Sequence, residues 1–494
     1  MAVTAALALT ATPTHASAVP DIRVIRAVPG APPPPRFVLL RYDAVVLGIH
    51  GTDDVVVDRA TGRFVDHTKA GPASSWDGYD GVRAWAGDAT GLAEVADQAD
   101  DRSMILATAY LLAGPPRVVP HVVRLSSNAR YVTDRLRYPA LSRSFDVRID
   151  RATGRLVSAE LRAQSSHTTL TVEAYRTIGS LVVPAAIRSH SDFGDMHETL
   201  RSVAFTAHVV SEAFSAPRPP NDTTLMGITT VPLAMYPDGP VVTIRVDDGP
   251  PLRVLVDTGS GYTLSASAAR RSKLRLFGSA TSGGVGPHLV PVRLATAKRV
   301  RIGGAVLRDQ PIEVLADRDL ADGGRTDGLI GYELFARLAA RIDLRLRRMQ
   351  LARRVSSLHP RGARIPIVLE GGQPQVDGEI DGLRGAITID TGSTYGLDVT
   401  SPAVRAHDLL RRYKAKVFEL GGGIGGSLPD YRAHARTVRL GRVVVHDVPL
   451  ALDLANGGAM DDPSTIGNAG LPLLRRFVIV FDYRGRAMYL DPVR

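Results

Sequence analysis

Two Asp-Thr-Gly-Ser turns, each at the end of a short apolar run, constrain the fold of this chain more than any other feature. The first turn begins at Asp257 after Val254-Leu255-Val256, and the second begins at Asp390 after Ala386-Ile387-Thr388-Ile389, 133 residues later. Average residue usage predicts one Asp-Thr-Gly by chance in about one of ten chains of this length. Two copies with matching apolar flanks are much rarer. The sequence therefore indicates two related units, each of which places a carboxylate at the end of a strand.

The segments around the two turns repeat in the same order. A strand pattern with an Asp-Gly turn precedes each copy, over 240–249 in the first and 374–382 in the second. A short helix is predicted after each copy, over 266–271 and 402–407. A glycine-rich stretch follows that helix, over 282–286 and 421–427. Each copy ends in an apolar segment with glycine, Leu329-Ile330-Gly331 in the first and Thr465-Ile466-Gly467 in the second. This alignment gives the second copy about three extra residues before Leu473. The chain therefore contains an internal repeat of roughly 130 residues.

The repeat and the local composition divide the chain into segments. Residues 1–18 are predicted to be a signal peptide, because a small-residue apolar run ends in Ala16-Ser17-Ala18. A β-rich N-terminal domain is expected over 37–214 and a proline-rich linker over 215–222, and the two repeats span 223–354 and 361–494. We therefore expect export to the periplasm or the medium, although no Lys or Arg precedes the apolar run, as a signal peptide would usually have.

The N-terminal domain shows strand and turn patterns without a convergent set of chemical groups. The same six residues occur at Asp58–Arg63 and Asp150–Arg155, and each copy is predicted to form a hairpin turn with glycine at positive φ. Residues 88–113 offer the plausible helix of this domain. This run of strands around one helix resembles the open β-barrel of bacterial lipoprotein-carrier proteins, and we use that resemblance for the fold alone.

Each repeat resembles the retropepsin-like aspartic protease family in its strand into Asp-Thr-Gly, its glycine-rich flap and its terminal apolar-apolar-Gly segment. The resemblance covers about 270 residues of the C-terminal half. It implies a mainly β fold in which two lobes of the closed β-barrel type face each other, with both acids supplied by one chain, as in pepsin-like enzymes. A monomer with an internal pseudo-dimer is therefore favoured over a homodimer. The flap tyrosine of pepsin-like enzymes has no obvious counterpart.

The resemblance assigns the chemistry to Asp257 and Asp390. Two carboxyls at hydrogen-bond distance share one proton, so the charged member activates a water and the protonated member polarises the scissile carbonyl. The three residues after each acid are expected to support it, Thr258, Gly259 and Ser260 in the first turn and Thr391, Gly392 and Ser393 in the second. The resemblance implies that the threonines lock the two turns together. The glycines let the backbone approach the carboxylates, and the serines donate to the outer carboxylate oxygens. Flaps that exclude water are expected at Gly284, Val285, Gly423 and Ile424.

The composition excludes several other classes of protein and site. The chain has no cysteine, so it has no disulfide, no thiolate metal site and no cysteine nucleophile. Its net charge of +10 comes mostly from arginines that are spread along the chain, without the interleaved aromatic residues that a nucleic-acid platform needs. No apolar segment is long enough to span a membrane. No motif indicates a cofactor or a metal, and we expect neither, nor a nucleic-acid partner.

The sequence thus predicts an aspartic endopeptidase that hydrolyses polypeptide substrates by activating water between two carboxyls. The alternative is a non-catalytic lipid- or peptide-binding protein on a degenerate acid-protease scaffold. The separation of Asp257 and Asp390 in the folded chain distinguishes the two, because only carboxyls within hydrogen-bonding distance share a proton.

Overall fold

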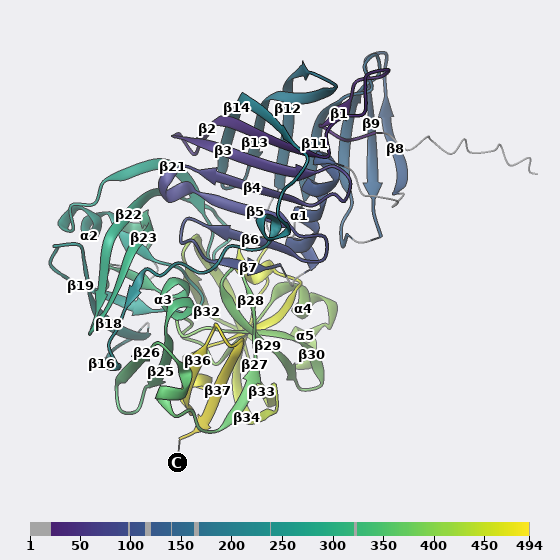
Figure 1. Ribbon diagram of the computed structural model, residues 1–494. Helices are drawn as coiled ribbons and strands as arrows, with labels where there is room; N and C mark the ends of the chain where they lie inside the picture. The colour runs from purple at the N-terminus through teal and green to yellow at the C-terminus, as the bar shows by residue number, and fades with distance from the viewer. Residues whose placement is uncertain are drawn as a thin grey trace, which may run out of the picture.

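The computed structural model describes residues 21–96, 99–113, 120–139, 141–162, 167–237, 239–320 and 324–493. The protein is mainly β, as predicted, with a large sheet built by its N-terminal half and further sheets built by its C-terminal half (Figure 1). The predicted signal peptide, residues 1–18, lies outside the described residues. Within those residues, no helix has both the length and the apolar character needed to cross a membrane.

The N-terminal half forms one antiparallel sheet of 14 strands. The strands are β1 (Arg26–Ala27), β2 (Phe37–Val46), β3 (Ile49–Asp58), β4 (Phe64–Lys69), β5 (Ser75–Tyr79), β6 (Ala84–Asp88), β7 (Ala93–Val95), β8 (His121–Ser127), β9 (Tyr131–Arg137), β10 (Phe145–Asp150), β11 (Leu156–Arg162), β12 (His167–Ile178), β13 (Leu181–Ser191) and β14 (Gly194–Thr206). Strands β2 and β14 lie side by side in the middle, β7 and β8 form the two ends, and β1 pairs with β13. Among the described residues the end strands do not pair with each other, so the sheet stays open.

A helix, α1 (Ala99–Leu112), packs against β5 and β6 of this sheet. It starts later than predicted, because residues 88–95 form a tight turn and the end strand β7 instead. Gly91 adopts a φ of 73° in that turn. The repeated hexapeptide forms both predicted hairpin turns, with a φ of 76° at Gly62 and 63° at Gly154. The apolar core of this half begins before the predicted start at residue 37, since Ile22 and Val24 are buried in it.

Each repeat of the C-terminal half closes into a barrel, as predicted. The strands of the first repeat's sheet are β15 (Thr223–Thr224), β17 (Ala234–Tyr236), β18 (Gly239–Val246), β19 (Pro251–Val256), β20 (Thr263–Ser265), β21 (Leu276–Ser282), β22 (Val290–Ile302), β23 (Ala305–Leu315) and β24 (Gly328–Ile330). Pairing follows β23-β20-β24-β19-β18-β22 and returns from β22 to β23, which closes the ring.

The second barrel has the same order of strands. Its sheet contains β28 (Val368–Glu370), β29 (Gln373–Ile380), β30 (Leu383–Ile389), β31 (Leu397–Val399), β32 (Lys416–Gly423), β33 (Gly426–Leu440), β34 (Val443–Leu452) and β35 (Thr465–Ala469). Pairing follows β29-β30-β35-β31-β34-β33 and returns from β33 to β29. The two barrels are therefore equivalent strand by strand, and their hydrogen-bond registers identify equivalent residues.

A further sheet joins the two repeats, a feature that the predicted division of the chain does not include. It consists of β16 (Ile228–Pro232), β26 (Arg348–Ala352), β25 (Ala339–Asp343), β36 (Phe477–Asp482), β37 (Ala487–Pro492) and β27 (Ala363–Pro366), in that order. The equivalent strands β25 and β36 pair antiparallel at its centre. Asp343 and Asp482 accept hydrogen bonds from Leu346 N (2.9 Å) and Gly485 N (3.0 Å) in equivalent turns, so both carboxyls have a structural role.

Short helices connect the strands of the C-terminal half. The α-helices are α2 (Ala266–Arg271), α3 (Tyr332–Arg337), α4 (Ser401–Ala406), α5 (Leu409–Arg412) and α6 (Leu471–Leu474). Helix α2 has the predicted bounds, and α4 begins one residue before the predicted start. Ser265 caps α2, since its hydroxyl accepts a hydrogen bond from Ala268 N (3.1 Å).

The N-terminal sheet contacts α3 through the turn between β6 and β7. Arg337 is almost fully buried there, and its guanidinium donates to Thr90 O (2.7 Å) and pairs with Asp222 (2.6 Å) at the end of the predicted linker. Leu92 joins the apolar core of the C-terminal half. The linker and the two halves are therefore held together by a buried ion pair and apolar packing.

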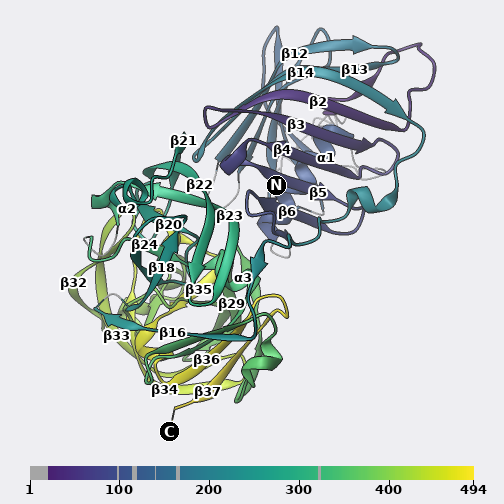
Figure 2. The ribbon, with the colours of Figure 1, turned by 60° about the vertical axis from the view of Figure 1, so that its left-hand side comes forward.

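Two hairpin ends of the N-terminal sheet also reach β21, the outer strand of the first glycine-rich hairpin. Ser279 N donates to Leu47 O (2.9 Å), and Thr281 N donates to Phe193 O (3.2 Å). Both ribbon views place β21 beside the N-terminal sheet (Figure 1, Figure 2). The N-terminal domain thus holds one strand of the first predicted flap.

Candidate active site

The two acids sit at the ends of equivalent strands, one in each barrel. Strands β19 and β30 end one residue before Asp257 and Asp390. Each strand runs parallel to the strand of its terminal apolar segment, β24 in the first barrel and β35 in the second. Asp257 N donates to Ile330 O (3.0 Å), and Asp390 N donates to Ala469 O (2.9 Å). The backbone of each acid is therefore fixed by the same contact.

These equivalent contacts correct the alignment of the two terminal segments. Ala469 occupies the place of Ile330, so the residue equivalent to Gly331 is Gly470 and not the glycine of Ile466-Gly467. No extra residues then remain before the helix that follows. The sequence alignment is wrong because β35 pairs irregularly with β30 near its start and carries an added residue there, while Ile466-Gly467 imitates the motif.

Two threonines lock the acidic turns together, as predicted. Thr258 Oγ1 donates to Ile389 O and Thr391 Oγ1 donates to Val256 O, both at 2.7 Å. In return, Thr258 N donates to Thr391 Oγ1 (3.1 Å) and Thr391 N donates to Thr258 Oγ1 (3.0 Å). Both threonines are fully buried. Each hydroxyl therefore bridges the two lobes directly beneath the acids.

The glycines of the two turns allow each carboxyl to lie against the opposite turn. A Cβ atom at Gly259 would lie 3.0 Å from the carboxyl carbon of Asp390, and one at Gly392 would lie 2.4 Å from that of Asp257. Each glycine N–H also donates to the acid of its own turn, Gly259 to Asp257 Oδ1 (2.8 Å) and Gly392 to Asp390 Oδ1 (2.7 Å). The two carboxyls therefore meet where the lobes join.

The two carboxyls lie within hydrogen-bonding reach of each other, and this contact changes the titration of Asp257. Burial, the charge of Asp390 and the hydrogen bond between the carboxyls raise the pKa of Asp257 well above its ordinary value. The Gly259 N–H and the Ser260 hydroxyl lower it by less. A neighbouring carboxylate disfavours a second charge, so Asp257 keeps its proton to a higher pH than an isolated carboxyl does.

The predicted role of the serines is wrong for Ser393. Its hydroxyl donates to Asp398 Oδ2 (2.8 Å) on β31 and not to Asp390. Burial raises the pKa of Asp398 to about 8, so this carboxyl is neutral at moderate pH. The Ser260 hydroxyl lies 3.3 Å from the main-chain oxygens of both Asp257 and Gly261, either of which its one hydrogen reaches, and Ser260 lowers the pKa of the Asp257 carboxyl.

Two amide side chains of the second barrel complete the site, and the sequence interpretation missed both. Asn468 Nδ2 donates to Asp390 Oδ2 (2.8 Å), the oxygen that does not accept from Gly392 N. Gln373 Nε2 donates to Gly259 O (2.8 Å) and so reaches the turn of the other lobe. A signal for Asn468 existed, because it is a polar residue in a segment that is apolar in the first repeat.

The glycine-rich stretches form two hairpins whose ends meet. The first is β21–β22 and the second is β32–β33. Gly286 N donates to Ile424 O (2.9 Å), and His288 N donates to Gly425 O (3.1 Å). The predicted tip residues therefore come together, with Val285 against Gly423 and Gly284 against Ile424.

The end of the second hairpin also reaches the neighbourhood of the acids. Ile424 packs against an apolar cluster that contains Leu255 and Leu329. These residues lie on β19 and β24, the strands that position Asp257. The paired hairpin ends therefore lie close to the first acidic turn, where a flap would act.

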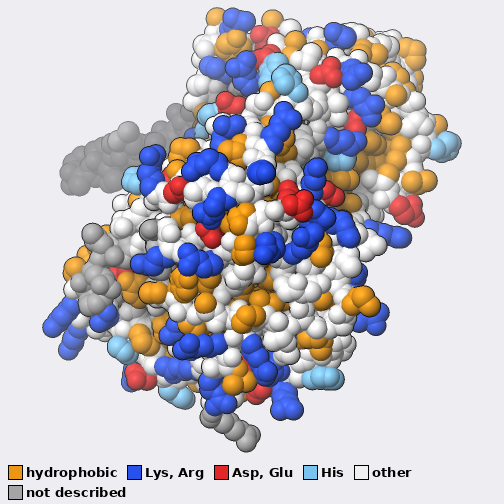
Figure 3. Space-filling model, turned by 90° about the vertical axis from the view of Figure 1, so that its left-hand side faces the viewer, with side chains coloured by type: hydrophobic (Ala, Val, Ile, Leu, Met, Phe, Trp, Pro, Cys, Tyr) orange, Lys and Arg blue, Asp and Glu red, His pale blue; other side chains and the backbone are white. Residues whose placement is uncertain are grey.

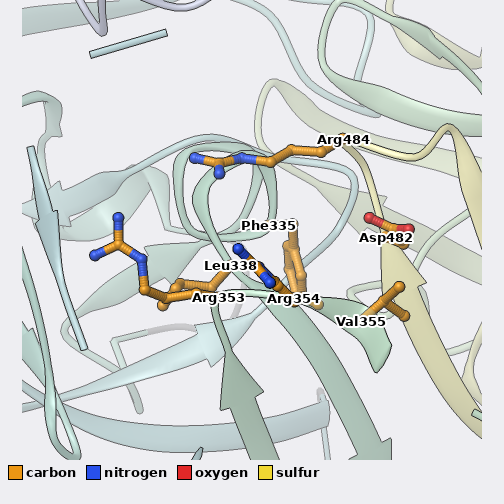
Figure 4. Close-up of a pocket in the computed structure, with 8 residues that line it drawn as sticks. Phe335, Leu338, Arg353, Arg354, Val355, Asp482 and Arg484 are labelled. Atoms are coloured by element: carbon orange, nitrogen blue, oxygen red, sulfur yellow. The ribbon is translucent and has the colours of Figure 1, made fainter. Parts of the chain in front are cut away.

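A pocket of about 290 Å³ lies elsewhere, next to the sheet that joins the repeats (Figure 4). Its polar lining includes Arg353, Arg354, Asp482 and Arg484, and none of its lining residues belongs to the acidic turns or the hairpin ends. Across the described residues, no three His, Asp or Glu side chains form a group that could hold a metal ion. On the face shown in Figure 3, Lys and Arg side chains are dispersed over many elements.

A protein-family model matches the part of the chain around the first acidic turn. The family model described as aspartyl protease matches residues 242–334, which contain Asp257 and the apolar segment at Leu329. The chain contains an aspartyl protease-like domain.

Other comparisons give weaker likenesses. No curated protein matches the chain. The crystal structure of Basic 7S globulin from soybean aligns with a TM-score of 0.35 and 10% identity, over 54% of this chain and 95% of that chain. A retropepsin-like aspartic protease from Rickettsia conorii aligns with a TM-score of 0.20 and 18% identity, over 24% of this chain and 90% of that chain.

Proposed function

We propose that the protein is an aspartic endopeptidase that hydrolyses peptide bonds with a water activated between Asp257 and Asp390. The observation that carries this proposal is the contact between the two carboxyls, on turns that Thr258 and Thr391 lock together. The aspartyl protease-like domain supports the class of enzyme. Both acids belong to one chain, so the proposed site needs no second subunit.

The reaction follows from the shared proton. The ionised carboxyl takes a proton from the water, whose oxygen attacks the carbonyl carbon, while the protonated carboxyl donates to the carbonyl oxygen. As the C–N bond breaks, the carboxyl that took the water's proton gives it to the leaving nitrogen. A hydroxyl of the intermediate returns its proton to the other carboxyl as the new carbonyl forms, so the pair again holds one proton. The substrate is a polypeptide in an extended conformation, and the hairpin ends joined at Gly286 and Ile424 separate to admit it.

Replacement of Asp257 by Asn tests this proposal. We expect hydrolysis of an unfolded protein substrate to fall by about 10³-fold or more, because Asn neither ionises nor gives up a proton. The melting temperature should change little, since an amide is close in shape to the protonated carboxyl. Asp390→Asn should have the same effect. The control is Asp248→Asn, because the Asp248 side chain is 84% exposed. Equal hydrolysis by wild type and Asp257→Asn would rule the proposal out.

The alternative, a binding protein on an inactive scaffold, makes different predictions for the same proteins. In that case the wild type and Asp257→Asn would bind an unfolded peptide with equal affinity, and neither would cleave it. Lipid extracted from the purified protein and identified by mass spectrometry would point to the open N-terminal sheet as a carrier. Export to the periplasm or medium also remains a proposal, which fractionation of the producing cells tests.

A further inference from the structure

The two lobes differ at one pair of equivalent positions beside the acids. In the first barrel Leu329 lies opposite Thr263, and in the second Asn468 lies opposite Asp398, in matching strand pairs. Leu329 is buried in an apolar cluster. Asn468 instead donates its amide hydrogen to Asp390 Oδ2 (2.8 Å). The two lobes therefore differ at a residue that hydrogen-bonds to one of the two carboxyls.

We infer that Asn468 is a positioning residue that fixes the negative charge of the pair on Asp390, so that Asp257 holds the shared proton. The inference rests on the proposed function and deepens it, since it assigns Asp390 as the base and Asp257 as the acid. The sequence leaves these two roles unassigned, because both turns have the same four residues.

The hydrogen bonds at the two acids support this assignment. The two acids accept equivalent glycine bonds, Asp390 Oδ1 from Gly392 N (2.7 Å) and Asp257 Oδ1 from Gly259 N (2.8 Å). Asp390 also accepts from Asn468 Nδ2 at Oδ2 (2.8 Å), whereas the apolar Leu329 stands at that place beside Asp257. Hydrogen bonds to a carboxylate favour its ionised form, and they are stronger than bonds between neutral groups. Asp257 is more deeply buried than its partner, and burial favours a neutral carboxyl. Both effects place the charge on the same residue.

The other titratable groups around Asp390 do not compete for that charge. Asp398, the residue opposite Asn468, has a pKa raised to about 8 by burial and is bonded by Ser393, so it stays neutral at moderate pH. Asp430 and Asp453 lie near Asp398 and raise its pKa further. Tyr483 also lies near the pair, and burial, followed by the charges of Glu94 and of the two carboxyls, raises its pKa well above the ordinary value. Asn468 Oδ1 accepts no hydrogen bond from the described residues, so no acceptor contact of this side chain competes with its bond to Asp390.

The pH profile of Asn468→Leu tests the inference, since leucine is the residue that the first lobe has at this place. Activity appears when the pair loses its first proton and disappears when it loses the second. Loss of the Asn468 amide donor destabilises only the states in which Asp390 is charged. The rise of kcat/KM on the acid side of the pH profile should therefore move to higher pH by about one to two units. The basic limb should stay in place, because Asp390 is charged on both sides of that step. Asn468→Ala serves as a second variant if leucine disturbs folding.

Two other outcomes would overturn the inference. A shift of the basic limb alone would mean that Asp257 carries the charge and Asp390 the proton. A uniform loss of activity with both limbs in place would mean that Asn468 is merely structural. Gln373→Leu is the matched control, because it removes another amide donor from the site, one that contacts Gly259 O and no carboxyl. Its activity is expected to fall without a shift of either limb.

A titration without catalysis separates this inference from the proposed function. In an Asp257→Asn background, Asp390 titrates alone, and carbon-13 NMR of its carboxyl follows it; the signal is assigned by its absence from Asp257→Asn/Asp390→Asn. Adding Asn468→Leu should move the midpoint of this carbon-13 signal to higher pH, because the charged carboxylate loses a hydrogen-bond donor. An unchanged midpoint would contradict the role of Asn468. If the shift occurs in a protein that cleaves no peptide, the inference stands and the proposed function fails.

Discussion

Replacement of Thr258 by Val isolates the lock between the two lobes. Valine keeps the branched shape but has no hydroxyl. The change removes the donor to Ile389 O (2.7 Å) and the acceptor of Thr391 N (3.0 Å), and Thr258 is fully buried. Each buried main-chain group left without its partner costs about 1–3 kcal/mol, so the loss of two partners should lower the free energy of unfolding of the C-terminal half by about 2–6 kcal/mol.

The matched control is Thr400→Val. Thr400 is also buried, and its hydroxyl donates to Thr465 O (2.7 Å) within the second lobe alone. That change leaves one main-chain group unpaired, so it should cost about 1–3 kcal/mol. It should not reduce activity beyond its effect on stability, whereas Thr258→Val should, because the lock positions both acids.

Urea unfolding measures both variants, and the tryptophans separate the two halves of the chain. Trp76 and Trp85 both lie in the N-terminal half, so tryptophan fluorescence follows that half, while circular dichroism follows the whole protein. Thr258→Val should move the dichroism transition to lower urea and leave the fluorescence transition less affected. A loss no larger than that of Thr400→Val, with full activity, would refute the idea that the threonines lock the lobes.

Three further predictions concern the hairpins, the buried carboxyl and the domain contact. Gly286→Ala should reduce kcat/KM by about tenfold or more with little change in stability. The reason is that a Cβ at this position would lie 2.1 Å from the Gly425 carbonyl carbon and force the hairpin ends apart. Unchanged kinetics would contradict a role for this contact. Asp398 has a folded pKa of about 8, above its unfolded value, so the folded state binds more protons than the unfolded state between about pH 4 and 8. The free energy of unfolding of the wild type should therefore fall by up to about 1.4 kcal/mol per pH unit as the pH rises through this range. Urea unfolding of Asp398→Asn should show a smaller fall in stability over the same range. Arg337→Met should destabilise the protein by about 3–5 kcal/mol, because it leaves the Asp222 carboxylate without its buried partner. Thermal unfolding measures this loss, and a change below about 1 kcal/mol would argue that the ion pair does not hold the two halves together.

Local patterns predicted the parts of the fold that depend on nearby residues. The hairpin turns at Gly62 and Gly154 and the bounds of α2 follow from turn chemistry and capping, which act within a few residues. The correspondence between the strands of the two barrels was predictable because the same order of segments occurs twice along the chain. The start of α1 was not, because the pairing of β7 with β6 takes residues that would also suit a helix.

The finer structure of the site depends on contacts between distant strands, which single segments do not encode. The match of Gly470 to Gly331 needs the register of β35 against β30, and the sequence offers Ile466-Gly467 as a false match. Ser393 turns to Asp398 because β31 brings that carboxyl within 2.8 Å of its hydroxyl. The contact between β21 and the N-terminal sheet likewise joins residues far apart in the chain, and no motif marks it.

The central claim is that Asp257 and Asp390 hold one proton between them at moderate pH, and proton counting tests it most directly. Potentiometric titration of the folded wild type and of Asp257→Asn/Asp390→Asn, compared between about pH 3 and pH 9, gives the protons bound by the pair. The account predicts that at about pH 5 the wild type binds one proton more than the double variant. A difference of zero at that pH would mean that both carboxyls ionise independently, and it would contradict the shared proton.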